Sequence, residues 1–230
     1  MSTFDLLEKR RHVRKYTDKI PPKEQIEFAL WQAWKTTPSK NQSMAYQVLV
    51  WGPDKKKEKE AIWSLCAKSH RIVEETAIKE GYQTKYQDGG NYPNKDYGHI
   101  KDNAYLFTIH ARLSKPNPYY SQQIKSGHFY DQMYEEKIEK IIDATAVEVG
   151  IFASNLSLYL LEQGIDMSYN SCFRRRPEEW AKVGLDYVKF RPISMISCGY
   201  SEIYRLDAMK ERGQNMADRK PEYEDIIKWI

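Results

Sequence analysis

Two groups of basic side chains, one near each end of the chain, have the chemistry needed to bind an anionic ligand. The first is Arg10-Arg11-His12-Val13-Arg14, and the second is Arg219-Lys220. A guanidinium forms paired hydrogen bonds with phosphate oxygens, so arginines that folding brings together would form a phosphate site. If the first group is helical, Arg10 and Arg14 lie on one face, four residues apart. A short basic run is by itself more often an exposed helix end, so its function depends on what the fold places beside it.

A polar turn over residues 38–43 is the second candidate for binding. Its side chains include Ser39, Asn41 and Gln42, and it lies shortly before an apolar run at residues 46–51. Polar residues are expected wherever a helix gives way to a strand. The turn therefore indicates a ligand site only in combination with the basic groups.

Several other chemistries have no support in the sequence. It contains neither GxGxxG nor GxxxxGK[ST], the glycine-rich phosphate-binding motifs, and no GxSxG turn of the serine hydrolases. The three cysteines are widely separated and form no CxxC pair, which fits a reducing compartment. The five histidines are not spaced as ligands on one helical face. We therefore expect no metal site, and a reactivity that is borrowed from a bound cofactor.

The length allows one large domain or two small ones, and because no linker or internal repeat divides the sequence we expect a single domain over residues 1–230, in the cytoplasm. The chain has 36 lysines and arginines against 32 aspartates and glutamates, and a net charge of +4 gives little reason to expect a nucleic-acid partner. No apolar stretch reaches the ~20 residues that span a bilayer, and the first residues lack the order of a secretory signal. We accordingly expect neither nucleic acid nor a membrane as a partner.

Hydrophobic periodicity and turn residues predict alternating helices and strands. Helices are expected over residues 3–13, between Pro21 and Pro38, over 56–69 and 134–163, and from residue 177; strands are expected over 46–51, 104–111, 165–169 and 191–200. A long loop is expected at about 81–103, and an extended tail at about 205–230.

Two helices carry the clearest patterns. In the second helix a buried stripe is expected from Ile26, Ala29, Leu30, Ala33 and Trp34. The helix over 134–163 is apolar on every side from Ile141 onward, which predicts a buried central helix ending at Gly164. Strands separated by helices around one buried helix indicate an α+β layered domain.

Five short segments, taken in order, resemble the nitroreductase family. Residues 10–16 (Arg-Arg-His-Val-Arg-Lys-Tyr) are similar to the family's opening Arg-Arg-Ser-x-Arg-x-Phe. Residues 38–46 stand where the family carries Pro-Ser-x-x-Asn-x-Gln-Pro-Trp. Residues 160–165, 192–200 and 219–227 resemble the end of the family's central helix, its strand ending in Gly-Tyr and its closing Arg-x-Pro element. His12, Gln42 and residues 44–46 depart from the family pattern.

The resemblance implies a nitroreductase-like α+β fold, with a central, mostly antiparallel sheet flanked by helices around a buried central helix. It also implies a homodimer with an FMN site. In that site Arg10, Arg11 and Arg14 would contact the phosphate and ribityl chain, Arg219 would close on the phosphate, and His12 could donate a further hydrogen bond. Gln42 or its neighbour Asn41 would contact the flavin ring, with Ser39 in the same motif. A backbone amide near Ser171 and Cys172 would face flavin N5.

We therefore interpret the chain as an FMN-dependent oxidoreductase. Hydride would pass from NADH or NADPH through FMN to a small organic acceptor, such as a nitroaromatic or quinone-like compound, in a ping-pong reaction. One alternative is a flavin- or nucleotide-binding protein of the same fold without NAD(P)H turnover, because the second motif is altered. Another is a nucleic-acid-binding protein that uses residues 10–14, residues 174–176 and exposed tyrosines.

Overall fold

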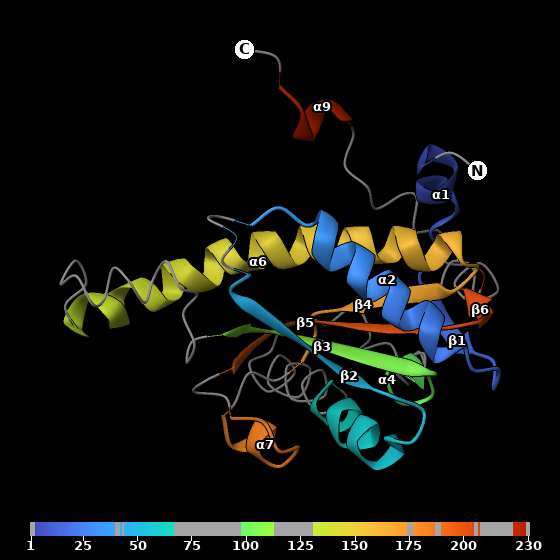
Figure 1. Cartoon of the computed structure of the whole chain (residues 1–230), viewed down its shortest axis with the longest axis horizontal. Helices are drawn as coiled ribbons and strands as arrows, with labels where there is room; N and C mark the ends of the chain where they lie inside the picture. Colours follow the sequence, from blue (N-terminus) through green and yellow to red (C-terminus); the bar gives the residue numbers. More distant parts are fainter. Residues whose placement is uncertain are drawn as a thin grey trace, which may run out of the picture.

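The computed structural model shows the arrangement of the elements in Figure 1. It describes residues 3–39, 42, 44–66, 98–112, 131–173, 177–186, 190–204, 207 and 223–228. Most of the predicted loop at 81–103 and most of the predicted tail lie outside these residues. The described end of the loop contains a short helix, α4 (Gly98–Lys101), and the tail contains another, α9 (Tyr223–Ile226).

A four-stranded antiparallel sheet forms the centre of the fold, as the sequence predicted. In spatial order its strands are β2 (Tyr46–Trp51), β3 (Tyr105–Arg112), β5 (Phe190–Gly199) and β4 (Asp166–Asn170). Each neighbouring pair is antiparallel. Residues 105–111 of β3 are buried without interruption, because helices cover both faces of the sheet.

The helices form a layer on each face of the sheet (Figure 1). On one face lie α2 (Lys23–Thr36) and the long α6 (Asp131–Glu162); on the other lie the helical segment 56–66 and α7 (Pro177–Ala181). Successive residues of β3 contribute to different layers, because strand side chains alternate between faces. Phe107 packs in the core that contains Phe152 and Leu156 of α6, whereas Leu106 packs with Ile62 and Trp180.

A second, two-stranded sheet corrects the prediction for the start of the chain. Helix α1 (Thr3–Lys9) ends before the basic group, and β1 (Val13–Tyr16) pairs antiparallel with β6 (Ser201–Tyr204). The predicted helix to residue 13 is therefore too long, and the shared helical face of Arg10 and Arg14 is wrong. Pairing with a strand near the other end of the chain outweighs the local helical preference.

The buried helix faces were predicted only in part. Ile26, Ala29 and Ala33 of α2 are buried, but the Trp34 side chain, which was expected in the same stripe, is 53% exposed. In α6, Val149, Phe152 and Leu156 are buried, whereas Val147 is 66% exposed. Apolar residues at helical spacing show which side of the helix they share. Whether another helix or strand covers that side depends on how the elements pack. Gly164, at φ +72, ends α6 in the left-handed conformation that its position predicted.

Candidate functional site

Residues 10–14 run along the edge of β4 and are fastened to it by one side chain. The Val13 N–H donates to Ser168 Oγ at 2.6 Å, and Ser168 Oγ donates to the Val13 carbonyl at 3.0 Å. Both residues are buried. A serine that satisfies both backbone groups of Val13 holds the basic segment in one register against β4, which sequence reasoning did not foresee.

Arg10 is the predicted arginine that this attachment places best for ligand binding. It is half-buried, and its guanidinium carbon lies 5.9 Å from the centre of the Tyr169 ring. The Tyr169 hydroxyl donates to the Ala153 carbonyl of α6 at 2.9 Å, and burial raises the pKa of that hydroxyl. The ring is therefore a fixed, neutral platform whose face attracts the Arg10 cation.

The remaining basic side chains take different positions. Arg11 is exposed and donates to the backbone carbonyls of Glu8 and Arg10, so in this structure its guanidinium caps the end of α1. Arg14 is half-buried within β1. The structure thus places Arg10 and Arg11 in different surroundings, although they are neighbours in the predicted group. Arg219 lies outside the described residues.

His12 contacts His99, a residue to which the sequence interpretation gave no role. Its ring lies edge-on to that of His99 in α4, with ring centres 5.4 Å apart. His99 is only 2% exposed, and α4 packs against β1. No spacing signal connects two histidines so far apart in sequence, so only the tertiary structure could identify the pair. An imidazole can donate to an anion, which suits His12 for a place beside Arg10.

The polar turn is anchored on α6 through Ser39. Ser39 Oγ donates to Glu148 Oε2 at 2.8 Å and accepts the Met44 N–H at 2.9 Å, while the Gln42 N–H donates to the Ser39 carbonyl at 3.0 Å. Gln42 and Met44 have φ values of 55 and 41, a left-handed conformation that is uncommon outside glycine. Asn41, the alternative to Gln42, lies outside the described residues.

The turn and the basic segment are held at different sides of α6. Ser39 is anchored at Glu148, and the Tyr169 platform of Arg10 is anchored at Ala153. Five residues along an α-helix correspond to about 7.5 Å of axial rise and a rotation of about 140°. Within one chain, the two predicted parts of the site are therefore attached to different faces of the same helix.

The segment after β4 has an unexpected hydrogen bond. Ser171 and Cys172 are exposed, as a cofactor contact requires, but the Cys172 N–H donates to Asn170 Oδ1 at 2.7 Å. Asn170 Nδ2 in turn lies 3.6 Å from Cys66 Sγ. This backbone donor, predicted to face flavin N5, has a side-chain acceptor in the structure. Asn170 was missed because its role depends on a turn that brings its own side chain back to the backbone.

Two of the cysteines are unsuited to redox chemistry. All three are free, and Cys66 and Cys198 are buried. Burial raises the pKa of the Cys66 thiol to about 12 and also raises that of Cys198. Because the thiolate is the reactive form, both act as small apolar groups near neutral pH.

Metal-ligand clusters and membrane-spanning helices are both absent from the described part of the chain. Within it, no group of three or more histidine, cysteine, aspartate or glutamate residues could hold a metal ion. None of the helices there has the length and apolar character that crossing a bilayer requires.

Comparison with known proteins adds family evidence to this geometry. The model of the nitroreductase family matches residues 7–200. No curated protein matches the chain in a sequence search.

Solved structures resemble the fold closely at low sequence identity. One is a candidate NAD(P)H:FMN oxidoreductase from Staphylococcus epidermidis, with 13% identity and a TM-score of 0.66 over 100% of this chain and 96% of that one. A second is a candidate nitroreductase from Exiguobacterium sibiricum in complex with FMN, with 13% identity and a TM-score of 0.64 over 100% and 98%. A third is oxidised iodotyrosine deiodinase bound to FMN and 3-iodo-L-tyrosine, with 19% identity and a TM-score of 0.59 over 89% and 92%.

Proposed function

The chain belongs to the nitroreductase family, and on this basis we propose that it is an FMN-dependent oxidoreductase. It would transfer hydride from NADH or NADPH to a small organic acceptor. The observation that carries the proposal is the position of Arg10, which is half-buried over the Tyr169 ring at the edge of β4. Two of the similar structures contain FMN, which supports FMN as the ligand of this site.

The chemistry of the donor set fits FMN. Arg10 and Arg14 would bind the phosphate and the ribityl chain, and His12 would donate a further hydrogen bond. Arg219 is proposed for the same phosphate from the tail. Ser39 and Gln42, or Asn41 in its place, would contact the ring. Bound FMN would supply a flavin that accepts hydride from a nicotinamide and releases it to the acceptor.

The backbone after β4 would stabilise the ring. We propose that the backbone of Ser171 and Cys172 lies beside flavin N5. Because Asn170 Oδ1 accepts the Cys172 N–H, that donor would have to exchange its acceptor when the ring binds. Alternatively, Asn170 would keep the Cys172 amide and the neighbouring backbone would make the contact. A main-chain donor needs no particular side chain, so the substitution of the family's usual residues does not remove the function.

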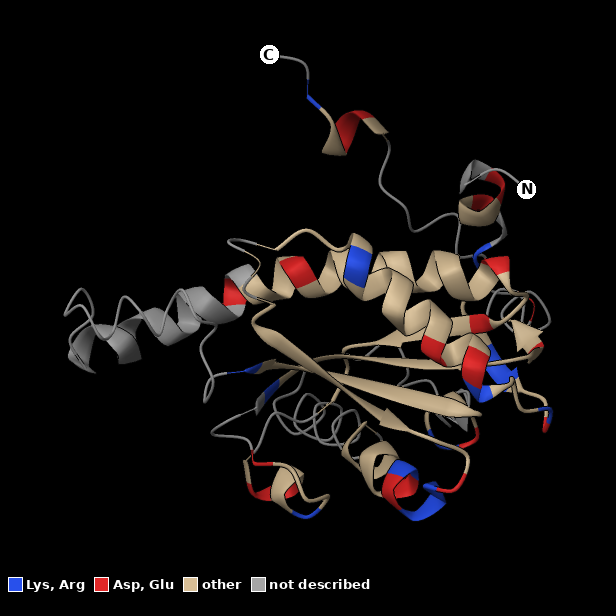
Figure 2. Cartoon of the chain, viewed as in Figure 1, with Lys and Arg blue, Asp and Glu red and all other residues tan. Residues whose placement is uncertain are grey.

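We also propose that the protein is a homodimer. The outer face of α6 carries Val147, 66% exposed, and Gly150, whose surroundings are open. Much of the described length of α2 and α6 is drawn without charge in Figure 2. In α9 the side chains of Tyr223 and Ile226 are 61% and 65% exposed. Large apolar side chains exposed on these helices favour a subunit interface. A second subunit would also explain why the polar turn and the basic segment occupy different sides of α6: each would complete the other subunit's site.

A second candidate function is FMN binding without NAD(P)H turnover. The engaged Cys172 amide favours it, because a donor that stays on Asn170 would not stabilise a reduced ring. The similarity to iodotyrosine deiodinase indicates that the acceptor need not be a nitro compound. We propose that the protein acts in the cytoplasm, where its three free cysteines would stay reduced.

The visible spectrum of the purified protein tests the proposal first. We expect a flavin spectrum, FMN released by heat, and bleaching of the bound flavin by NADH or NADPH without oxygen. Bound FMN that neither nucleotide reduces would favour the second candidate. A colourless protein that takes up no added FMN would overturn both, and would support the nucleic-acid alternative if binding to nucleic acid then proved steeply salt-dependent.

A matched pair of variants tests the site itself. Arg10→Ala removes a charge-assisted contact and is expected to weaken FMN binding by about tenfold or more. Lys15→Ala is the control, because Lys15 is an exposed neighbour in β1 that pairs with Glu202. Equal FMN affinity in the two variants would show that Arg10 does not hold the phosphate.

A further inference from the structure

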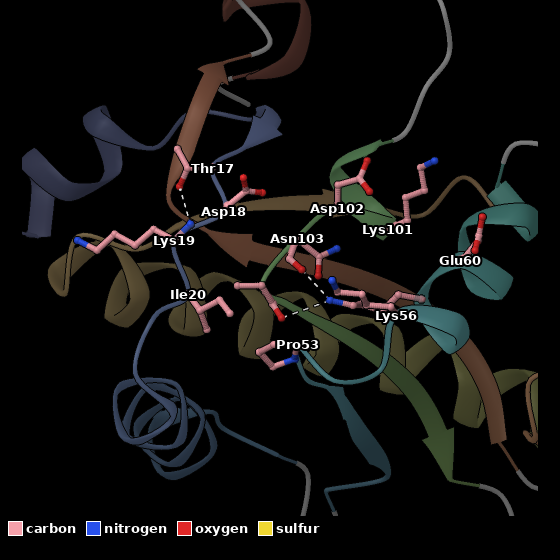
Figure 3. A pocket seen from close by; sticks show the side chains of 12 residues that line it. Thr17, Asp18, Lys19, Ile20, Pro53, Lys56, Glu60, Lys101, Asp102 and Asn103 are labelled. Atoms are coloured by element: carbon pink, nitrogen blue, oxygen red, sulfur yellow. Dashed lines mark hydrogen bonds between the residues drawn. The ribbon is translucent and has the colours of Figure 1, made fainter.

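A cavity of about 520 Å³ lies at the end of the sheet where β2 stops and β3 starts, and the proposed flavin site does not use it. Three stretches of the chain, residues 17–20, 53–60 and 101–104, contribute to its wall (Figure 3), and it is lined by Thr17, Asp18, Lys19, Ile20, Pro53, Lys56, Lys59, Glu60, Lys101, Asp102, Asn103 and Ala104. None of these residues belongs to the predicted FMN set. Its volume lies in the range of small-molecule sites.

Lys59 is the feature of this cavity that needs explanation. Its side chain is only 2% exposed, and its ammonium donates to the Asn103 carbonyl at 2.6 Å and to the Ala104 carbonyl at 3.4 Å. Burial lowers the pKa of Lys59 from its usual 10.5. An ammonium has three hydrogens to donate, so one remains beyond these two bonds.

Asp102 and Asp54 raise the pKa of Lys59, but burial outweighs them. Among the described residues, no ion pair within 4.0 Å involves Lys59 or the other three lysines of the cavity. Lys19 lies over the Tyr200 ring at 4.5 Å and Lys101 over the Trp63 ring at 4.4 Å, so these two cations are held at aromatic faces. Buried charges in proteins are usually paired with an opposite charge. A buried ammonium with no direct carboxylate partner among the described residues therefore lies on the wall of this cavity, where an anionic ligand would pair with it.

The charge of the lining limits what that anion can be. Four lysines face three carboxylates, those of Asp18, Glu60 and Asp102. The formal excess is one positive charge, which a monoanion balances and a dianionic phosphate would exceed. The Thr17 side chain, which Figure 3 shows in the lining, suits a ligand that also carries hydrogen-bonding groups.

We propose that this cavity is a binding site for a small polar monocarboxylate, whose carboxylate accepts hydrogen bonds from Lys59 and Lys56. Lys59 supplies a preorganised donor, because its two carbonyl contacts hold the ammonium in place. Lys56 supplies an exposed cation in the same lining. The site would bind its ligand independently of FMN, since the two sites share no residue.

Titration of the full chain with sodium lactate, followed by backbone amide NMR, tests the proposal. We expect saturable shifts at residues 59 and 101–104, and none beyond general salt effects with sodium chloride at equal ionic strength. Sodium phosphate should bind more weakly. Shifts with lactate that match those with chloride would overturn the site, and tighter binding of phosphate would overturn the choice of a monocarboxylate.

Variants on one helix identify the cation that binds. Lys59→Met is expected to weaken lactate binding by about tenfold or more, because a charge-assisted bond is lost. Lys56→Met should weaken it several-fold, and it keeps the proposal testable if Lys59→Met does not fold. Lys57→Met is the matched control, since Lys57 is exposed on the same helical segment and does not line the cavity. Equal affinity in Lys56→Met, Lys57→Met and the unchanged protein would contradict the proposed contacts.

Discussion

His110 should make the protein sensitive to acid, and the effect can be calculated from its surroundings. It lies in the middle of the sheet on β3, with no exposed surface, and its ring stands edge-on to Trp180 with ring centres 5.5 Å apart. Among the described residues, neither ring nitrogen has a hydrogen-bond partner. Burial lowers the pKa of His110 from 6.5 to about 4. The folded state therefore excludes the charged form, which the unfolded chain accepts.

The direction and the size of the change in the free energy of unfolding with pH follow from this difference in pKa. At pH 8 the imidazole is neutral in both states, and its titration does not affect the free energy of unfolding. As the pH falls, the unfolded state takes up the proton first and is stabilised. Proton linkage then lowers the free energy of unfolding by about 2 kcal/mol at pH 5 and about 3 kcal/mol at pH 4, where the folded form begins to titrate. Below that pH the loss levels off.

The substitution His110→Phe keeps a ring against Trp180 and removes the titration. The assay is urea unfolding of both proteins, followed by tryptophan fluorescence, at several pH values from 8 to 4. At pH 8 the two proteins differ in free energy of unfolding only through the change in packing, so this difference serves as the reference. We expect the variant to gain about 2 kcal/mol relative to the unchanged protein by pH 5. A difference between the two proteins that stays constant over this range would refute the argument that burial keeps His110 neutral.

Two further predictions concern the attachment of the basic segment and the subunit interface. Ser168→Ala leaves the buried Val13 N–H without its acceptor at 2.6 Å, so it should cost about 1–3 kcal/mol of stability in urea unfolding; Ser154→Ala, at an exposed position on α6, is the control, and equal losses would contradict a special role for Ser168. Val147→Glu places a charge on the exposed face of α6 and should convert a dimer to a monomer in analytical ultracentrifugation, whereas Lys57→Glu, far along the chain at an exposed position, should not. A Val147→Glu protein that remains dimeric would show that this face is not the interface.

Local patterns in the sequence determined the elements of the central sheet and of the helices. Apolar runs such as residues 46–51 became strands, and the continuous apolar character of the long helix predicted a central one. Prolines and glycines marked the ends, as Gly164 does for α6. The family resemblance was also contained in the sequence, because short motifs in a fixed order do not depend on knowing what lies beside them.

Only the tertiary structure decided which of those residues meet. Arg10 and Arg11 are equivalent as sequence, but the Val13–Ser168 bonds set a register in which Arg10 faces Tyr169 and Arg11 caps α1. Asn170 and His99 carried no signal, since their contacts join segments far apart in the chain or depend on a single turn. Trp34 and Val147 fit a buried pattern and are exposed. Helical periodicity shows on which side of a helix a residue lies, whereas strand pairing and the covering of a helix face depend on segments that are distant in the sequence.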